Sequence, residues 1–126
     1  SNYDQSFWLS LLYAILDGLS TALGISRDDL DGVLYPGRGT LSEPALVLFD
    51  NVPGGAGHVK RAIEDEKTLL SILTAAYQKV TTCTCGAEQG HASCYGCLRN
   101  YQNQFCHEDL DRRVVIDFLK GIGVGI

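Results

Sequence analysis

The sequence has no surplus of basic side chains. Its 126 residues include 10 lysines and arginines against 15 aspartates and glutamates, which gives a formal net charge of −5. A protein that binds nucleic acid on its own usually has a basic surface, because neutralised phosphates supply most of its non-specific affinity. DNA binding through the overall charge is therefore excluded. Any contact with DNA must use a local patch or be shared with a partner.

The sequence also lacks methionine and a long apolar run. The longest apolar stretch, Phe7 to Leu16, ends at Asp17, well short of the ~20 residues that a membrane span needs. No basic leader precedes this stretch, so we expect no signal peptide, no membrane partner and a cytoplasmic location. Because the chain opens with Ser1 and Asn2 and has no methionine, we expect a fragment of a longer protein.

The apolar pattern predicts one α+β domain over residues 1–126. A helix with one apolar stripe is expected from Phe7 to Leu23, ended by Gly24. Two β-prone runs, Gly32–Tyr35 and Ala45–Phe49, should pair as an antiparallel hairpin. The second run is apolar on both faces, so we expect helices on each side of it. The remaining expected elements are a short helix capped by Ser26 with Asp29, a helix over 58–80 with a break near 64–67, and a last helix from Leu110 with Asp109 as its N-cap.

Four of the five cysteines form two short pairs, Cys83 with Cys85 and Cys94 with Cys97. Structural zinc takes tetrahedral sets of four ligands, commonly as two such pairs. A disulfide within the first pair would be strained, and tight clustering fits a metal in a reduced compartment. Geometry favours zinc over an iron–sulfur cluster. The sequence therefore predicts one structural Zn²⁺ on these four thiolates, organising a loop of about residues 81–107.

Three other side chains are alternatives for one of the zinc ligands. These are His91, Cys106 and His107. We interpret Cys106 as a spare thiol and His107 as a polar residue near the last helix. A set of four thiolates leaves no open position for water, so hydrolysis at this ion is not expected.

A glycine-rich turn follows the second β-prone run. It contains Gly54, Gly55 and Gly57 and leads into a helix that starts at His58. Free amides at a helix start can hold a phosphate or a carboxylate, so these residues are candidate contacts for an anion or nucleic acid. The motif of nucleotide P-loops is absent. The alternative is a tight strand-to-helix crossing in which the glycines permit close packing.

Two further features bear on activity. His58, Lys60 and Asp65 match the H-x-K-x4-D string of phospholipase D-type phosphodiesterases. On a helix, however, residues two apart point about 200° apart and cannot share one phosphate, so we interpret the match as chance. Near the last cysteine pair, Arg99 lies among amides and aromatics that include Tyr101 and Phe105. This stretch could bind nucleic acid, but we expect the two rings to pack the loop onto the body.

These residues together resemble a known family. The run from Leu48 to Gly57, the two cysteine pairs, and the stretch ending in Leu110-Asp111-Arg112 look like the MZB zinc-binding domain, over about residues 33–119. That domain lies C-terminal to the motor of superfamily-two DEAD/DEAH-type DNA helicases of mitomycin-repair and phage-defence types. The resemblance implies that Cys83, Cys85, Cys94 and Cys97 bind zinc.

The resemblance also implies a function. We expect a zinc-stabilised accessory domain of an ATP-dependent DNA helicase, which supports DNA engagement or motor architecture. Its partners would be the motor domains of the same parent chain and, through them, DNA, with no small-molecule substrate. The fragment has no ATPase motif and should not be an enzyme by itself. The alternatives are a stand-alone protein-interaction or phage-defence module, and a phosphodiesterase that uses His58 and Lys60. The expected fold is a small antiparallel sheet flanked by helices, with a zinc-organised loop.

Overall fold

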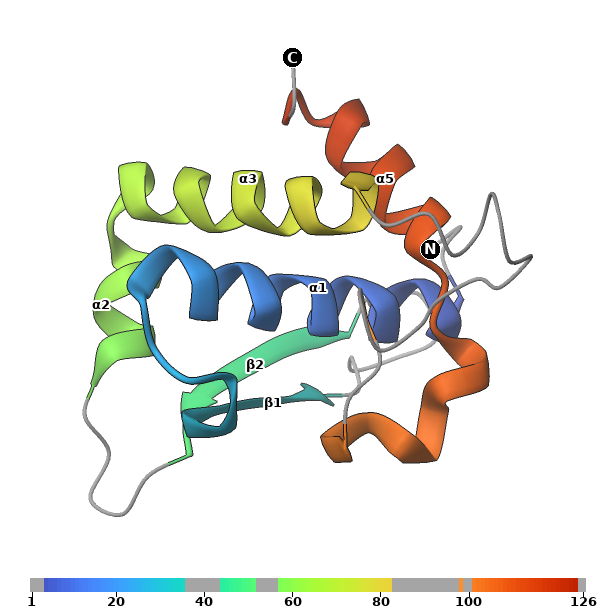
Figure 1. The fold of residues 1–126 in the computed structure, drawn as a ribbon, viewed down its shortest axis with the longest axis horizontal. Helices are drawn as coiled ribbons and strands as arrows, with labels where there is room; N and C mark the ends of the chain where they lie inside the picture. The colour runs from blue at the N-terminus through green and yellow to red at the C-terminus, as the bar shows by residue number, and fades with distance from the viewer. Residues whose placement is uncertain (1–3, 36–43, 52–56, 83–97, 99–100, 125–126) are drawn as a thin grey trace.

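The helices and the hairpin are stacked in layers. A computed structural model describes residues 4–35, 44–51, 57–82, 98 and 101–124. In Figure 1, α1 lies between α3 and α5 on one side and the β1–β2 hairpin on the other. The α+β prediction is confirmed. The elements in chain order are α1 (Gln5–Leu23), the 3-10 helix η1 (Arg27–Asp29), β1 (Leu30–Tyr35), β2 (Ala45–Asp50), α2 (His58–Glu64), α3 (Glu66–Thr82), the 3-10 helix η2 (Tyr101–Asp109) and α5 (Arg112–Gly121).

Helix α1 begins and ends at defined caps. The Asp4 carboxylate accepts a hydrogen bond from the Phe7 amide at 3.0 Å, which satisfies one of the free donors of the first turn. Gly24 ends the helix with φ 66°, and its amide donates to the Ser20 carbonyl. This confirms the predicted end, because a left-handed backbone is readily adopted by glycine. After it, Ser26 caps only the 3-10 turn η1, a shorter element than predicted.

Helix α1 is buried on all sides, so the prediction of a single apolar stripe is wrong. Leu9, Leu11 and Tyr13 are buried in addition to the stripe residues Leu12 and Leu16. A helix with neighbours on opposite sides buries more than one apolar stripe, and its buried polar residues Ser10 and Asp17 have hydrogen-bond or ion-pair partners. By length and composition α1 could cross a membrane, but 61% of the window that passes this test is buried inside the protein. The core position accounts for the composition.

The hairpin pairs as predicted, with Val33 opposite Val47. Its residues alternate between a face toward α1 and an exposed face. Gly32 lies where a Cβ atom would be only 2.9 Å from Leu12 Cδ1, so glycine permits α1 to approach the sheet. The expectation that helices cover both faces of β2 is wrong: among the described residues the sheet has only β1 and β2, and Val47 and Phe49 are exposed.

Helices α2 and α3 meet at Asp65, which confirms the predicted break. The Asp65 carboxylate accepts a hydrogen bond from the Thr68 amide at 3.1 Å and so starts α3. Helix α3 then crosses α1 at Gly18, where a Cβ atom would be only 2.3 Å from the Ile72 carbonyl oxygen and 2.9 Å from the Ala76 nitrogen. Glycine at this position sets how closely the two helices approach.

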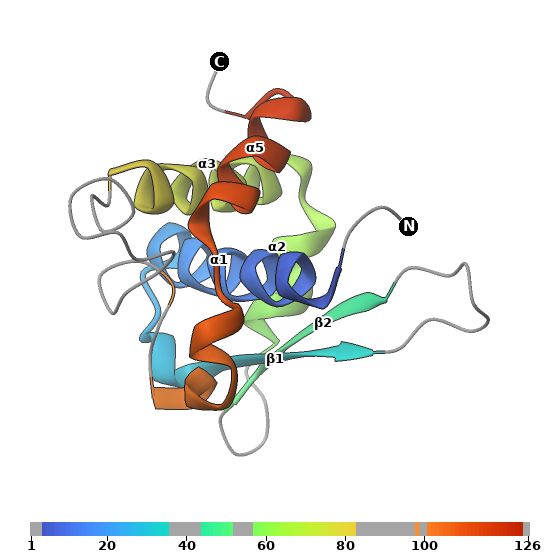
Figure 2. The same ribbon diagram turned by 90° about the vertical axis from the view of Figure 1, so that its right-hand side faces the viewer.

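The last helix starts later than predicted. The N-cap of α5 is Asp111 and not Asp109; its carboxylate accepts a hydrogen bond from the Arg113 amide at 2.9 Å. The Asp111 amide donates to Ser10 Oγ of α1 at 2.8 Å, and Leu110 is fully buried. The preceding residues 101–109 form η2 and not an irregular loop. Figure 2 shows α5 beside the ends of α1 and α3, with η2 below.

Candidate metal centre

The predicted zinc ligands Cys83, Cys85, Cys94 and Cys97 lie outside the described residues. The residues that flank them do not. Val80 precedes them near the end of α3 and is 1% exposed, and Leu98 follows them and is fully buried. The described residues on either side of the cysteine segment, Val80 and Leu98, therefore both lie in the core.

A buried asparagine binds the residue that follows the second cysteine pair. Asn103 is fully buried, and its Nδ2 donates to the Leu98 carbonyl at 2.7 Å. The thiol of Cys106 donates in turn to the Asn103 carbonyl at 3.5 Å. Both Asn103 and Cys106 have non-helical backbone angles, with φ −112° and −132°, so η2 is kinked where these contacts form. The hydrogen bonds fix Leu98, the neighbour of Cys97.

A buried arginine binds a carbonyl near the end of α3, before the first cysteine pair. Arg112 is 8% exposed, and its Nη1 donates to the Val80 carbonyl at 2.8 Å. The Val80 carbonyl lies in the last turn of α3, where no amide of the helix can donate to it, and the hydrogen bond from Arg112 satisfies it. Among the described residues, the buried Nε of Arg112 has no hydrogen-bond partner. We call Val80, Leu98, Asn103, Cys106 and Arg112 the loop frame.

The loop frame contains a buried cation, Arg112. A set of four thiolates around Zn²⁺ would carry a net charge of about −2, and a cation stabilises negative charge that lies near it. The neighbouring Arg113 instead pairs with Asp111 at 2.9 Å. Sequence analysis did not identify Arg112 as a supporting residue, because its burial depends on contacts with residues distant in the chain.

Cys106 is a buried thiol. It is free and 3% exposed, and burial, with the charge of Asp109, raises the pKa of this thiol to about 11. The described residues include no group of three metal-ligating side chains around Cys106 or His107. His91, the other alternative ligand, lies outside the described ranges.

Comparison with known proteins places the chain. The family described as "MZB: MrfA Zn-binding domain" matches residues 11–98, a range that includes both cysteine pairs. The chain belongs to this family. The match begins within α1, earlier than the resemblance predicted, and ends at Leu98 of the loop frame.

A solved structure shares the fold of this MZB domain. It is titled "Crystal Structure of DUF1998 helicase MrfA bound to DNA", with a TM-score of 0.62 and 20% sequence identity. The alignment covers 98% of the MZB domain and 16% of the helicase, so the domain spans about a sixth of that protein's length. No curated protein matches in a sequence comparison.

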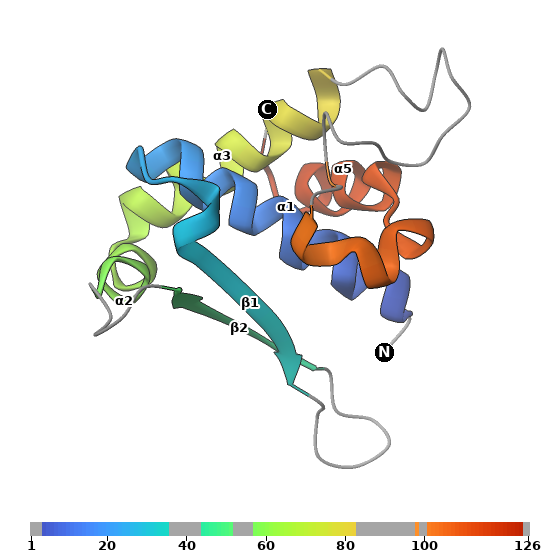
Figure 3. The same ribbon diagram turned by 60° about the horizontal axis from the view of Figure 1, so that its bottom comes forward.

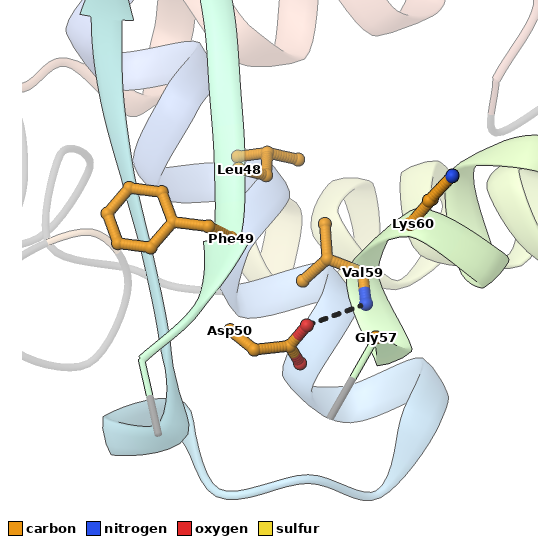
Figure 4. Close-up of a pocket in the computed structure, with 6 residues that line it drawn as sticks. All are labelled: Leu48, Phe49, Asp50, Gly57, Val59 and Lys60. Carbon is orange, nitrogen blue, oxygen red and sulfur yellow. Dashed lines mark hydrogen bonds between the residues drawn. The ribbon is translucent and has the colours of Figure 1, made fainter. Parts of the chain in front are cut away.

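The carboxylate of Asp50, which precedes the glycine-rich turn of the MZB domain, lies at the start of the helix that follows the turn. Figure 4 shows Asp50 beside the start of α2, where its Oδ2 accepts a hydrogen bond from the Val59 amide at 3.4 Å. A phosphate at this amide would be repelled by the Asp50 charge. Gly57 has φ 72°, a conformation that favours glycine without any ligand. Gly54 and Gly55 lie outside the described residues, so anion binding there stays a prediction.

The residues of the phosphodiesterase string are on α2 and just after it. His58 and Lys60 both belong to the helix, as the interpretation of a chance match requires, and helical geometry directs them apart. Asp65 starts α3 through Thr68. A shallow hollow of about 410 Å³ beside Lys60 is lined by Leu48, Phe49, Asp50, Gly57, Val59 and Lys60. The placement of His58 and Lys60 on one helix, two residues apart, agrees with the interpretation of the string as a chance match.

The aromatic stretch after the cysteines divides into two parts. Phe105 is 76% exposed, so the prediction that it packs the loop onto the body is wrong. Asn103, in the same stretch, is buried instead and donates a hydrogen bond to the Leu98 carbonyl. Arg99 lies outside the described residues, and its contact with nucleic acid stays a prediction.

Proposed function

We propose that this MZB domain is a zinc-stabilised accessory domain of an ATP-dependent DNA helicase. Membership of the zinc-binding family and a fold shared with a DNA-bound helicase over 98% of the chain support it. The observation that carries the proposal is the loop frame, which holds Val80 and Leu98, the described residues on either side of the cysteine segment, in the core. One Zn²⁺ would be held by Cys83, Cys85, Cys94 and Cys97.

The role of the ion in this proposal is structural. A zinc ion that binds four thiolates supplies cross-links where a small segment lacks its own core. The protein's own residues position the segment: Asn103 fixes Leu98, and Arg112 fixes Val80 and contributes a positive charge. The domain would have no catalytic residues and would support DNA engagement or motor architecture within the longer polypeptide. The proposed location of that polypeptide is the cytoplasm.

The test uses the longer polypeptide that carries this sequence. It should contain a Walker-type ATPase, hydrolyse ATP when DNA is added and unwind duplex DNA, while the 126-residue chain alone hydrolyses none. Replacing Cys97 by serine should release zinc and reduce unwinding at least about tenfold, which corresponds to ~1.4 kcal/mol. A matched Cys106→Ala variant should retain both zinc and unwinding. A polypeptide without an ATPase would instead support the stand-alone interaction module.

A further inference from the structure

The hairpin exposes an apolar face that nothing in the described structure covers. Val33, Tyr35, Val47 and Phe49 are 45%, 65%, 38% and 38% exposed; we call these four residues the outer sheet face. In the register, Val33 lies opposite Val47, with Tyr35 and Phe49 at either end of the pair. Figure 3 shows the hairpin at the edge of the molecule, with α1 on its other side and no described helix in front of it.

The composition of this face differs from that of an ordinary solvated strand. A two-stranded sheet packed on one side usually alternates apolar residues inside with polar residues outside. Here the inner positions Leu34, Leu46 and Leu48 are apolar as well. The outer sheet face exposes roughly 300–400 Å² of side chain, the scale of the largest apolar patch of a typical monomer, which often has a function.

Charge argues against DNA as the occupant. Among the described residues of this face, the only charged side chain is that of Asp31, opposite Phe49. Asp28 and Asp29, both exposed, lie just before β1. This acidic end would repel phosphates. An apolar protein surface with basic side chains at one end is the complementary partner.

Size argues against a freely diffusing occupant. A stable complex between separate proteins buries about 800 Å² on each partner, more than twice what this face offers. A domain tethered through the same chain needs less, because the linker holds it at an effective concentration that can reach about the mM range. The domain spans 16% of the helicase that shares its fold, so such a neighbour is available if the proposed function holds.

We propose that the outer sheet face docks on an apolar surface of another domain of the same polypeptide. This proposal rests on the proposed function and names the surface through which the accessory domain joins the rest of the helicase. The docking is independent of zinc geometry and of DNA, because the face lies on the hairpin and has no basic side chain among its described residues.

Hydroxyl-radical footprinting read by mass spectrometry tests this docking. In the 126-residue chain the Tyr35 ring should be oxidised rapidly, because its side chain is well exposed. In the longer polypeptide without DNA, oxidation of Tyr35 should slow at least fivefold. Phe105, another highly exposed ring among the described residues, is the internal reference, and its oxidation should change less than twofold.

Three results would overturn the proposal. They are equal oxidation of Tyr35 in both proteins, protection that appears only when DNA is added, and protection in the short chain that rises with its own concentration. The last two would assign the face to nucleic acid or to a second copy. Equal protection of Phe105 and Tyr35 would also count against a specific contact.

A set of variants separates docking from folding. V33T/Y35T/V47T keeps the strand preference of the hairpin while removing apolar surface; it should not alter unfolding of the short chain. In the longer polypeptide it should raise oxidation of Phe49 several-fold. The matched control I63Q/L70Q changes two exposed apolar residues on α2 and α3 and should leave Phe49 protected. An unchanged Phe49 in the hairpin variant contradicts the docking.

The two proposals can fail separately. DNA-stimulated ATP hydrolysis by the longer polypeptide tests the helicase assignment, and protection of Tyr35 tests the docking. Protection without hydrolysis would keep the interface and reject the helicase. Hydrolysis without protection would do the reverse.

Discussion

The helical layers and the loop frame are stabilised by different means. Around α1 the buried residues are mainly leucines and other apolar side chains, whose burial is non-directional and tolerant of sequence change. In the loop frame, Asn103 and Arg112 are buried, and their side chains donate hydrogen bonds to the carbonyls of Leu98 and Val80. Such bonds specify position more than they add stability. The helical layers thus form a general scaffold, and the frame positions one segment.

Removal of the metal should show the largest difference in stability between the helical layers and the loop frame. Because the binding free energy of a structural zinc, about 10 kcal/mol or more, is largely folding free energy, chelation or Cys94→Ser should unfold the segment that the frame anchors. The helices of the layers should lose less, because their core is apolar. Elemental analysis and circular dichroism would measure one zinc per chain and this unequal loss.

The spare thiol provides the control for zinc removal. Cys106→Ala should retain the full zinc content and lower the free energy of unfolding by about 1 kcal/mol, since it removes a buried sulfur and a weak hydrogen bond. Loss of zinc equal to that of Cys94→Ser would place Cys106 among the ligands.

A methyl group at Gly18 should damage the layers without removing the metal. Because a Cβ atom there would collide with the backbone of α3, Gly18→Ala should lower the free energy of unfolding by about 3 kcal/mol. Denaturant unfolding measures the loss. Gly121→Ala, where a Cβ atom meets nothing within 4 Å, is the matched control and should change stability by less than about 1 kcal/mol. Equal effects would show that the α1–α3 crossing is not tightly packed.

Loss of the Asn103 side-chain amide should lower the free energy of unfolding less than Gly18→Ala does, but more than loss of an exposed side chain. Asn103→Ala leaves the Leu98 carbonyl without its partner, which costs about 2 kcal/mol, and should also weaken zinc retention against a competing chelator. Asn103→Asp keeps the size of the side chain but loses the donor, so it should show a similar defect. Exposed Gln104 is the neutral control. Full zinc retention in both variants would remove Asn103 from the frame.

The cap of α5 should give the smallest effect, and one that depends on pH. Partial burial alone would raise the pKa of Asp111, but hydrogen bonds from Arg113 and the charges of Arg113 and Arg112 lower it. The stabilisation is therefore complete above the unfolded value near 3.8 and is lost as the pH falls through the lower folded pKa.

The variant Asp111→Asn isolates the contribution of the Asp111 charge to stability, because asparagine also caps helices. At neutral pH the variant should be less stable by a few tenths of a kcal/mol, since solvent screens this ion pair. Thermal unfolding at pH 7 and at successively lower pH would show the difference between variant and parent decrease in acid. A constant difference across this range would assign the effect to capping and not to charge.

Local patterns predicted most of the elements but not their surroundings. Gly24, the hairpin runs and the break at Asp65 follow from backbone preferences and short-range hydrogen bonds, which the neighbouring residues determine. The start of α5 was placed too early because Asp109 and Asp111 are both good caps, and the contact of Asp111 with Ser10, distant in sequence, selects between them. Exposure of Phe105 and burial of Asn103 likewise depend on what packs against η2.

The sequence by itself determined the chemistry of this protein: paired cysteines suit zinc through their spacing, and the family match follows from the order of its motifs. Only the tertiary structure decided which polar residues are buried and which apolar residues are exposed. Arg112 and Asn103 are buried with hydrogen bonds to Val80 and Leu98, and α1 covers one face of the hairpin while the described apolar residues of the other face are exposed. Such contacts join residues far apart in the chain, so local patterns do not encode them.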